Sequence, residues 1–290
     1  MAKRKRSNPP GRATRRPARP VAAGRGGRFL MLYGVHATLA ALSNRDRHCR
    51  RVLVTKDAER RLGDQLHVLL DHRRVRVELE TVERAELDRL LPPGAVHQGI
   101  AVEAEPLPEM ALDRLVRLLS GRESVVLVAL DHATDPQNVG AVLRSAAAFG
   151  ASGVIVTDRH APAATGALAK AAAGALEMVP ILTVVNLARA LRELKDEGYW
   201  CVGLDNAAER VLGGTALPAR IVLVLGAEGA GLRRLTRECC DLIVRIPVMP
   251  AIESLNVSTA AAVALYELHR RHQPPQPQNQ PTAPRRLQAR

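Results

Sequence analysis

The alternation of apolar and polar positions predicts a small α/β unit in the first part of the chain. Short apolar runs, which are typical of strands, alternate with segments in which apolar residues recur at helical spacing. The expected strands are 50–56, 75–79 and 99–105, and the expected helices are 33–42, 57–72 and 82–91. This unit covers residues 29–104, and the proline-containing stretch 105–110 that follows is typical of a linker.

A second alternation begins at residue 111 and ends near residue 271. Several of its strands are nearly continuous apolar runs, as expected for strands that are buried on both faces of a sheet. The expected strands are 124–131, 153–158, 179–184, 199–205, 220–226 and 242–247, and the expected helices are 111–120, 139–150, 163–176, 186–198 and 254–270. This regular exchange of strand and helix predicts a parallel sheet with helices on both faces.

The composition fits a soluble protein with an aliphatic core. Of the 290 residues 47% are hydrophobic but only 2% are aromatic, so Val, Leu, Ala and Ile must fill the core. No apolar run approaches the roughly 18 residues that span a bilayer, and we expect a cytoplasmic protein. The four cysteines show neither metal-ligand spacing nor a disulfide pattern. The adjacent Cys239 and Cys240 fit buried thiols better than metal ligands.

The excess of positive charge lies at the two ends of the chain. The formal net charge is +13; residues 1–28 carry ten Lys or Arg and residues 270–290 carry five Arg, and neither stretch holds an acidic residue. The arm 1–28 and the Pro- and Gln-rich tail 272–290 are therefore expected to be disordered. Such an arm can attract RNA phosphates by counterion release. A solubility segment is the alternative, and a mitochondrial presequence is disfavoured because no amphipathic face can be drawn.

Three polar loops follow strands of the second unit, where ligands gather in parallel sheets. In the first loop, 131–140, an Asp135-Pro136 turn precedes Asn138 at the expected helix start, and Arg144 lies on the second turn of that helix. From spacing alone, this pattern fits a capped helix with a surface arginine better than it fits a site.

The other two loops are equally ambiguous when each is taken alone. The second, 226–231, holds three glycines that would let a ligand approach the backbone, although it does not match a dinucleotide-binding fingerprint. The third, 247–256, runs into the last helix with more polar residues than one helix cap needs. These polar residues are Glu253, Ser254, Asn256, Ser258 and Thr259.

Taken together, the three loops resemble a known set of motifs. In this order and spacing, "DPQNVGAVLRSA", "LGAEGAGL" and "IPVMPAIESLNVSTAAAVALYE" resemble the motifs of the SPOUT RNA 2′-O-ribose methyltransferases, in particular the TrmH/RlmB branch. "YGVHAT" and "GAVHQGIAVEAE" are similar to the start and end of the N-terminal domain of the RlmB-type 23S rRNA guanosine methyltransferases. "VPILTVVNLARAL" and "GLRRLTRECCD" are also similar to that subgroup, and the resemblance covers about residues 29–270.

The resemblance implies a parallel-sheet SPOUT domain of the α/β class at 111–271, with a C-terminal trefoil knot, preceded by a small α/β RNA-binding domain. It implies that the knot forms a pocket for S-adenosylmethionine (SAM), that no metal takes part, and that a homodimer joins active-site parts across its interface. The alanine run 260–264 would suit such an interface, although core packing predicts the same pattern. The implied reaction is SAM-dependent 2′-O-methylation of a guanosine of 23S rRNA, in the peptidyl-transferase P loop.

The resemblance also assigns roles to individual residues. The implied catalytic residues are Arg144, Asn138, Glu228, Ser254 and Asn256, and the implied cofactor-binding residues are Gly226, Ile246, Leu255 and Asn256. Because arginine is almost always protonated, Arg144 suits a clamp on an RNA phosphate that also stabilises the developing alkoxide better than it suits a general base. Asn138 is expected to orient Arg144 or the ribose, and Glu228 to hold its loop or pair with a basic partner.

One position departs from the family pattern, and alternatives to the main function also stay open. Pro250 stands where the family usually has glycine; proline fixes φ and lacks an N–H, so SAM binding could weaken or the loop could be rebuilt. The same reaction on another rRNA site stays open because these subfamilies share all three motifs, whereas the same reaction on tRNA is disfavoured by the N-terminal domain. A non-catalytic RNA-binding or ribosome-assembly protein is disfavoured because the site residues are present. A Rossmann-type methyltransferase is disfavoured because no glycine-rich loop follows the first strand of the second unit.

Overall fold

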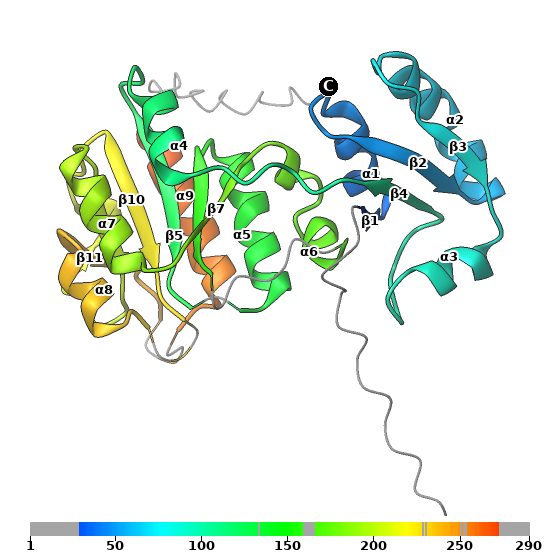
Figure 1. The fold of residues 1–290 in the computed structure, drawn as a ribbon. Helices are drawn as coiled ribbons and strands as arrows, with labels where there is room; N and C mark the ends of the chain where they lie inside the picture. Colours follow the sequence, from blue (N-terminus) through cyan, green and yellow to red (C-terminus); the bar gives the residue numbers. More distant parts are fainter. Residues whose placement is uncertain are drawn as a thin grey trace, which may run out of the picture.

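The computed structural model shows two α/β units side by side, connected by an extended segment (Figure 1). It describes residues 29–132, 134–158, 166–227, 229, 231–249, 251 and 254–272. We call residues 29–104 the N-terminal unit and residues 112–272 the C-terminal unit. The basic arm 1–28 and nearly all of the tail from 272 lie outside the described residues, as do Glu228, Pro250 and Glu253.

The N-terminal unit is built on a four-stranded mixed sheet with the strand order β1-β4-β2-β3. Strand β4 runs antiparallel to both β1 and β2, whereas β2 and β3 are parallel. The strands are β1 (Leu30–Tyr33), β2 (Cys49–Val54), β3 (Glu78–Thr81) and β4 (Ile100–Ala104), and the helices are α1 (Val35–Ser43), α2 (Lys56–Asp71) and α3 (Arg84–Leu90). The predicted α/β character is confirmed, but β1 was not predicted and β3 begins three residues later than expected.

The C-terminal unit contains a seven-stranded sheet in which every pairing is parallel. Its order is β7-β6-β5-β10-β8-β11-β9, so β10 inserts between two strands that precede it in the sequence. The strands are β5 (Val125–Leu130), β6 (Gly153–Thr157), β7 (Ile181–Val184), β8 (Trp200–Leu204), β9 (Arg210–Val211), β10 (Arg220–Leu225) and β11 (Leu242–Arg245). All six residues of β5 are buried, as its continuous apolar run predicted.

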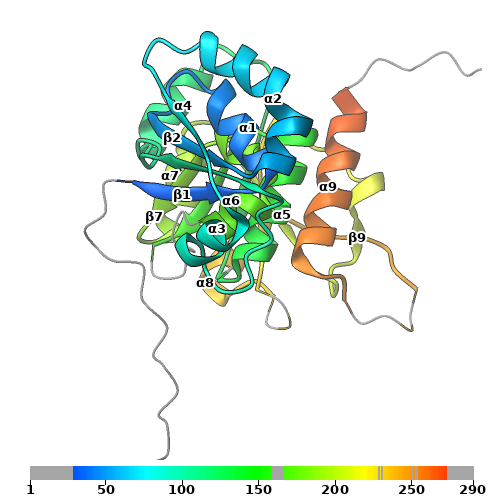
Figure 2. The same ribbon diagram turned by 90° about the vertical axis from the view of Figure 1, so that its right-hand side faces the viewer.

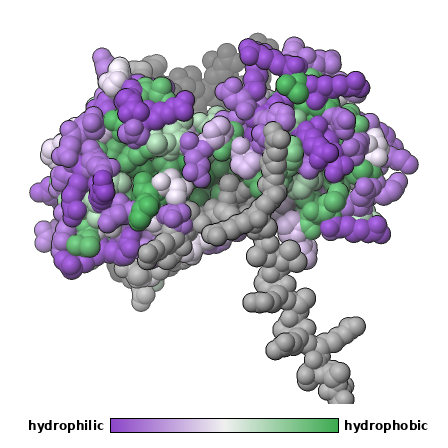
Figure 3. All heavy atoms as spheres, in the orientation of Figure 1, coloured by the Kyte–Doolittle hydropathy of each residue, from purple (hydrophilic) through white to green (hydrophobic). Residues whose placement is uncertain are grey.

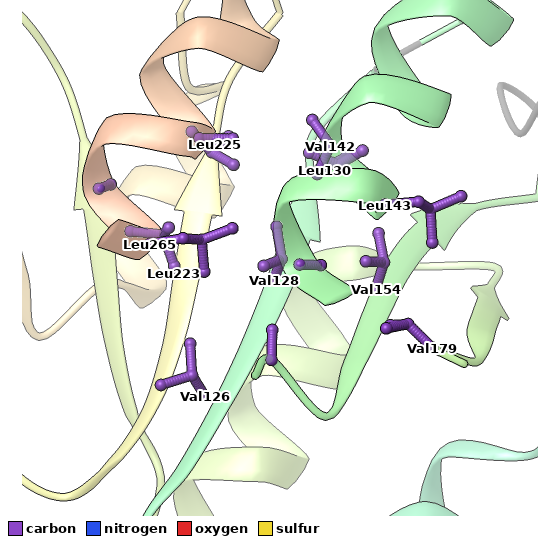
Figure 4. Close-up of a cluster of buried hydrophobic side chains, with 14 of the residues drawn as sticks. Val126, Val128, Leu130, Val142, Leu143, Val154, Val179, Leu223, Leu225 and Leu265 are labelled. Carbon is purple, nitrogen blue, oxygen red and sulfur yellow. The ribbon is translucent and has the colours of Figure 1, made fainter. Parts of the chain in front are cut away.

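Helices cover both faces of this sheet, which confirms the predicted layering. Side chains of β5, β6 and β10 pack with α5 and α9 in one core cluster (Figure 4), and α4, α7 and α8 cover a second cluster on the other face. The helices are α4 (Leu112–Leu119), α5 (Pro136–Ala148), α6 (Gly166–Ala171), α7 (Leu187–Asp196), α8 (Arg234–Cys239) and α9 (Val257–His272), with short 3₁₀ turns η1 (Ala175–Glu177) and η2 (Leu212–Gly214).

Two of the predicted helices differ from the structure for reasons that the local backbone and side chains show. The helix expected at 163–176 is interrupted because Ala173 (φ 48°) and Gly174 (φ 92°) adopt left-handed conformations, which end α6 and begin η1. The last helix was expected to begin at 254, but α9 begins at Val257 because the side chain of Asn256 binds the first turn from outside the helix.

The remaining general predictions concern cysteines and membranes. All four cysteines are free; Cys49, Cys201 and Cys239 are buried and Cys240 is partly buried, and burial raises the pKa of Cys201 and of Cys240 to about 12. No helix within the described part of the chain is long and apolar enough to cross a membrane. Hydrophilic side chains cover most of both units in the view of Figure 3.

Candidate active site

A cavity of about 390 Å³ opens at the carboxyl ends of three adjacent strands, β8, β10 and β11. Two of the three loops singled out in the sequence, 226–231 and 247–256, contribute to its wall. The residues around it are Leu204, Asp205, Asn206, Leu225, Gly226, Ala227, Gly229, Gly231, Ile246, Ser254, Leu255, Val257 and Ala260. The structure therefore places Gly226, Ile246, Ser254 and Leu255 around one cavity.

The glycine-rich loop after β10 folds back on itself as a tight turn. The backbone N–H of Ala227 donates to the Gly231 carbonyl (3.1 Å), and the N–H of Gly231 donates to the Ala227 carbonyl (2.9 Å). A Cβ atom on Gly226 would lie 2.1 Å from the carbonyl carbon of Gly231. Glycine is required at position 226 because any side chain there would overlap the backbone at the end of the turn. The sequence alone did not give this reason.

An ion pair between a buried carboxylate and a half-exposed arginine holds the far end of this loop against β5. The carboxylate of Asp131, which is 1% exposed, accepts hydrogen bonds from the backbone N–H (3.0 Å) and the Nε–H (2.7 Å) of Arg233. The Asp131 N–H donates to the Leu225 carbonyl (2.8 Å). Asp131 thus fixes the loop at both ends, a role that sequence reasoning missed because it read this residue only as the end of a strand.

Asn138, in the first turn of α5, contacts Asn256, which directly precedes α9. The Nδ2 of Asn256 donates to the Oδ1 of Asn138 (3.1 Å). The Oδ1 of Asn256 accepts from the backbone N–H (2.8 Å) and the hydroxyl (2.6 Å) of Ser258, so this oxygen caps α9. One side chain therefore caps a helix and joins two loops that lie far apart in the sequence.

Arg144 lies one helical turn beyond Gly140 on α5 and is exposed. Because α5 begins at Pro136, Arg144 falls on its third turn rather than the second. Asn138 and Arg144 are six residues apart and so point about 120° away from each other around the helix. The partner that the structure gives to Asn138 is Asn256, rather than Arg144.

Asp205 and Asn206 are cavity residues that the sequence analysis did not single out. They follow β8, and their neighbour Leu204 also lines the cavity. The Asp205 carboxylate accepts from the Ala207 N–H (2.8 Å) and pairs with Arg237, which fixes the loop. The signal that could have found them is the rule that ligands gather beyond the carboxyl ends of parallel strands, applied to β8 as well.

Comparison with known proteins places this arrangement in a family. Residues 125–266 match the SpoU rRNA Methylase family, and residues 31–110 match the family described as RNA 2′-O ribose methyltransferase substrate binding. The 23S rRNA (guanosine-2′-O-)-methyltransferase RlmB of Photobacterium profundum is 38% identical over 244 residues, which cover 84% of this chain and 98% of that protein.

The chain belongs to the SpoU rRNA methylase family. The RlmB protein of Escherichia coli K12 is 39% identical over 238 residues, covering 82% of this chain and 96% of that protein. Among solved structures, the SpoU methyltransferase AviRb from Streptomyces viridochromogenes in complex with the cofactor AdoMet matches with a TM-score of 0.69 and 25% identity, covering 84% of this chain and 90% of that one. The SpoU match spans all three loops described above.

Proposed function

We propose that this SpoU family protein transfers a methyl group from SAM to the ribose 2′-hydroxyl of a guanosine in 23S rRNA, in the peptidyl-transferase P loop. The observation that carries the proposal is the convergence of the loops after β8, β10 and β11 on one cavity, beside the Asn138–Asn256 contact. The RlmB relatives, whose names give this reaction on 23S rRNA, match over nearly their whole length.

The cavity suits SAM in size and in chemistry. Its volume of about 390 Å³ falls within the range of small-molecule sites. Ile246 and Leu255 supply apolar walls for adenine, the backbone of the 226–231 turn supplies polar groups, and Asp205 supplies acceptors for ribose hydroxyls. When bound there, SAM would supply a methyl group already activated on a sulfonium. Within the described residues, no group of three or more His, Cys, Asp or Glu could hold a metal ion.

The protein's own contribution is positioning and charge stabilisation. The exposed guanidinium of Arg144 can clamp the phosphate beside the target ribose and stabilise the oxyanion that develops on the 2′-oxygen. The Asn138–Asn256 bond holds the start of α5 next to the start of α9, so that the RNA side and the cofactor side of the site keep a fixed spacing. The roles assigned to Ser254, Glu228 and Pro250 stay predictions.

We assign RNA binding to the N-terminal unit, with domain boundaries at 29–104 and 111–271 around the linker 105–110. The match of residues 31–110 to a substrate-binding family supports this assignment. The basic arm 1–28 and the tail 272–290 would add contacts to RNA phosphates, and the protein would act in the cytoplasm.

A homodimer through α9 and a trefoil knot in the C-terminal part complete the proposal. Helix α9 lies at the edge of the molecule in Figure 2, and it carries Val263 (41% exposed) and Tyr266 (54% exposed), the latter edge-on to Phe149 at 5.8 Å. Exposed apolar side chains that cluster in this way mark interaction surfaces. Sedimentation at increasing protein concentration tests the dimer.

Mapping of 2′-O-methyl groups in cells with and without the gene tests the proposed reaction. We expect one 23S rRNA guanosine to lose its mark and to regain it when the gene is restored. Loss of a tRNA mark instead would overturn the assigned substrate. A purified protein that does not bind SAM in calorimetry would overturn the enzymatic function itself.

A further inference from the structure

The segment from α6 to η1 is packed tightly between the two units. On one side, a Cβ atom on Gly140 of α5 would lie 2.3 Å from the Cβ of Ala171. On the other side, a Cβ atom on Gly166 would lie 2.3 Å from the Met31 carbonyl oxygen of β1. Ala169 is 3% exposed and belongs to the core of the N-terminal unit. The N-terminal unit is thus close-packed on α6, which lies between it and α5 (Figure 1).

A buried ion pair crosses this junction. The guanidinium of Arg47 in the N-terminal unit lies 3.1 Å from the Oε1 of Glu177 in η1, and their side chains are 4% and 5% exposed. The Nδ2 of Asn44 donates to the other carboxylate oxygen of Glu177 (2.7 Å). Both oxygens of Glu177 are therefore satisfied by the N-terminal unit. Both charges are out of water when the units are docked, so a shift that separated them while they stayed buried would leave each charge uncompensated, and the pair therefore favours one docked arrangement over shifted ones.

The loop that carries Arg47 is itself fixed within the N-terminal unit. Arg73 donates to the carbonyls of Leu42 (2.8 Å) and Asn44 (3.1 Å), and also to that of Arg47. These bonds hold residues 44–47 against the end of α1. Because the loop is held in place, the Arg47–Glu177 contact depends on the placement of the whole unit rather than on the flexing of one loop.

A second polar contact lies at another point of the same junction. Lys170 of α6 donates to the side-chain oxygen of Gln98 (3.2 Å) and to the carbonyl of Val96. The same oxygen of Gln98 accepts the backbone N–H of Val35 (3.1 Å), which ties the contact to the start of α1. Two polar contacts with apolar packing between them restrict rotation as well as separation of the units.

We propose that Arg47 and Glu177 form a positioning pair that locks the RNA-binding unit at one place relative to α5. Helix α5 carries Asn138 and Arg144, and α6 joins it directly to the docked unit. The distance between the RNA-binding unit and Arg144 would then be fixed. The protein would select RNA substrates in which the bound segment and the target ribose are separated by that distance. This inference rests on the proposed RNA methyltransferase function.

The test combines steady-state kinetics with a distance measurement in the full-length protein. Glu177→Gln keeps the size of the side chain but leaves the buried Arg47 without its counter-charge. We expect the KM for a 23S rRNA fragment to rise about tenfold, with kcat at saturating RNA and SAM affinity each within about twofold. Energy transfer between dyes at Arg74→Cys and Arg192→Cys should show a broader distribution of distances between the units.

Two further variants separate positioning from general damage to the fold. The double variant Arg47→Met with Glu177→Leu replaces the ion pair by apolar groups and should restore both the KM and the narrow distance distribution. Glu193→Gln removes an exposed ion pair with Arg189 in the same unit and should change neither. An unchanged KM or an unchanged distance distribution in Glu177→Gln, or an equal loss of SAM affinity, would overturn the proposal. Wild-type methylation, measured alongside, tests the proposed function separately.

Discussion

Asn256 donates its side-chain amide to Asn138 (3.1 Å) while its side-chain oxygen caps α9. The two functions use different atoms of the same amide, and a substitution can therefore separate them. The capping oxygen stabilises the helix, whereas the donor joins the third loop to the first. This separation gives the first prediction.

Asn256→Asp should lower methyl transfer about tenfold while changing the melting temperature little. Aspartate keeps the capping oxygen but cannot donate to Asn138, so the third loop is no longer tied to the first at the site, although α5 and α9 still pack together in the core. Asn186→Asp is the matched control, because Asn186 caps α7 in the same way, accepting from Arg189 (3.1 Å), and it does not line the cavity. An equal effect of both substitutions on transfer would show that the Asn138 contact has no role in the reaction.

Arg144→Ala should reduce transfer by about 100-fold or more and leave SAM affinity nearly unchanged, because its guanidinium acts on the RNA and on developing charge. Single-turnover transfer and calorimetry with SAM measure the two quantities. Arg192→Ala on α7 is the control for loss of an exposed arginine. Parallel losses of transfer and SAM binding would make Arg144 a structural residue instead.

Gly226→Ala should abolish SAM binding and destabilise the protein by about 2 kcal/mol, because the added methyl group overlaps the Gly231 carbonyl. Gly63→Ala is the contrasting change. A Cβ atom at Gly63, on helix α2, would meet nothing within 4 Å, so this variant should be slightly more stable than the wild type. Denaturant titration and calorimetry compare the two variants, and SAM binding by Gly226→Ala would contradict the prediction.

Asp131→Asn should weaken SAM binding and lower the free energy of unfolding by about 2 kcal/mol. The substitution removes the carboxylate that holds Arg233 and, through it, the end of the 226–231 turn. Asp113→Asn breaks an exposed pair with Arg117 on α4 and should have almost no effect on either quantity. Wild-type SAM affinity in Asp131→Asn would show that the turn holds its shape without this pair.

The buried thiols predict a loss of stability at alkaline pH. Burial raises the pKa of Cys201 to about 12, so the unfolded chain loses the proton from this thiol at a lower pH than the folded protein does. The stabilising contribution is complete below the ordinary thiol pKa of about 8.5 and is lost as pH rises toward 12. Urea midpoints between pH 7 and pH 11 should fall less steeply in Cys201→Ala than in the wild type. Identical slopes would exclude a contribution from this thiol.

The sequence predicted elements best where one period or one burial state holds over several residues. The continuous apolar runs of β5 and β10 and the long amphipathic helix α2 were placed correctly. The two-residue strand β9 is too short to show a period, and α6 ends where Gly174 packs against Ala40, a contact with the other unit. Local patterns cannot reveal an element whose end is set by a distant contact.

The site was predicted only in part, because some of its residues gain their role through contacts with residues that are distant in the sequence. Motif resemblance pointed to Gly226, Ile246 and Leu255, which the structure brings together around the cavity. It did not reveal Asp131, because a carboxylate at the end of a strand gains its role only when Arg233 folds back onto it. It also passed over Asp205, which reaches the cavity only because β8 lies beside β10 in the sheet.

The position of β10 also determines the order in which a nascent chain can fold. The four-stranded sheet of the N-terminal unit is complete in sequence by residue 104, whereas the middle of the parallel sheet cannot close until residue 225 has left the ribosome, because β10 separates β5 from β8. Pairings across such sequence distances form slowly. The sheet of the first unit can therefore form early during synthesis, before α6, which packs on it, has been synthesised.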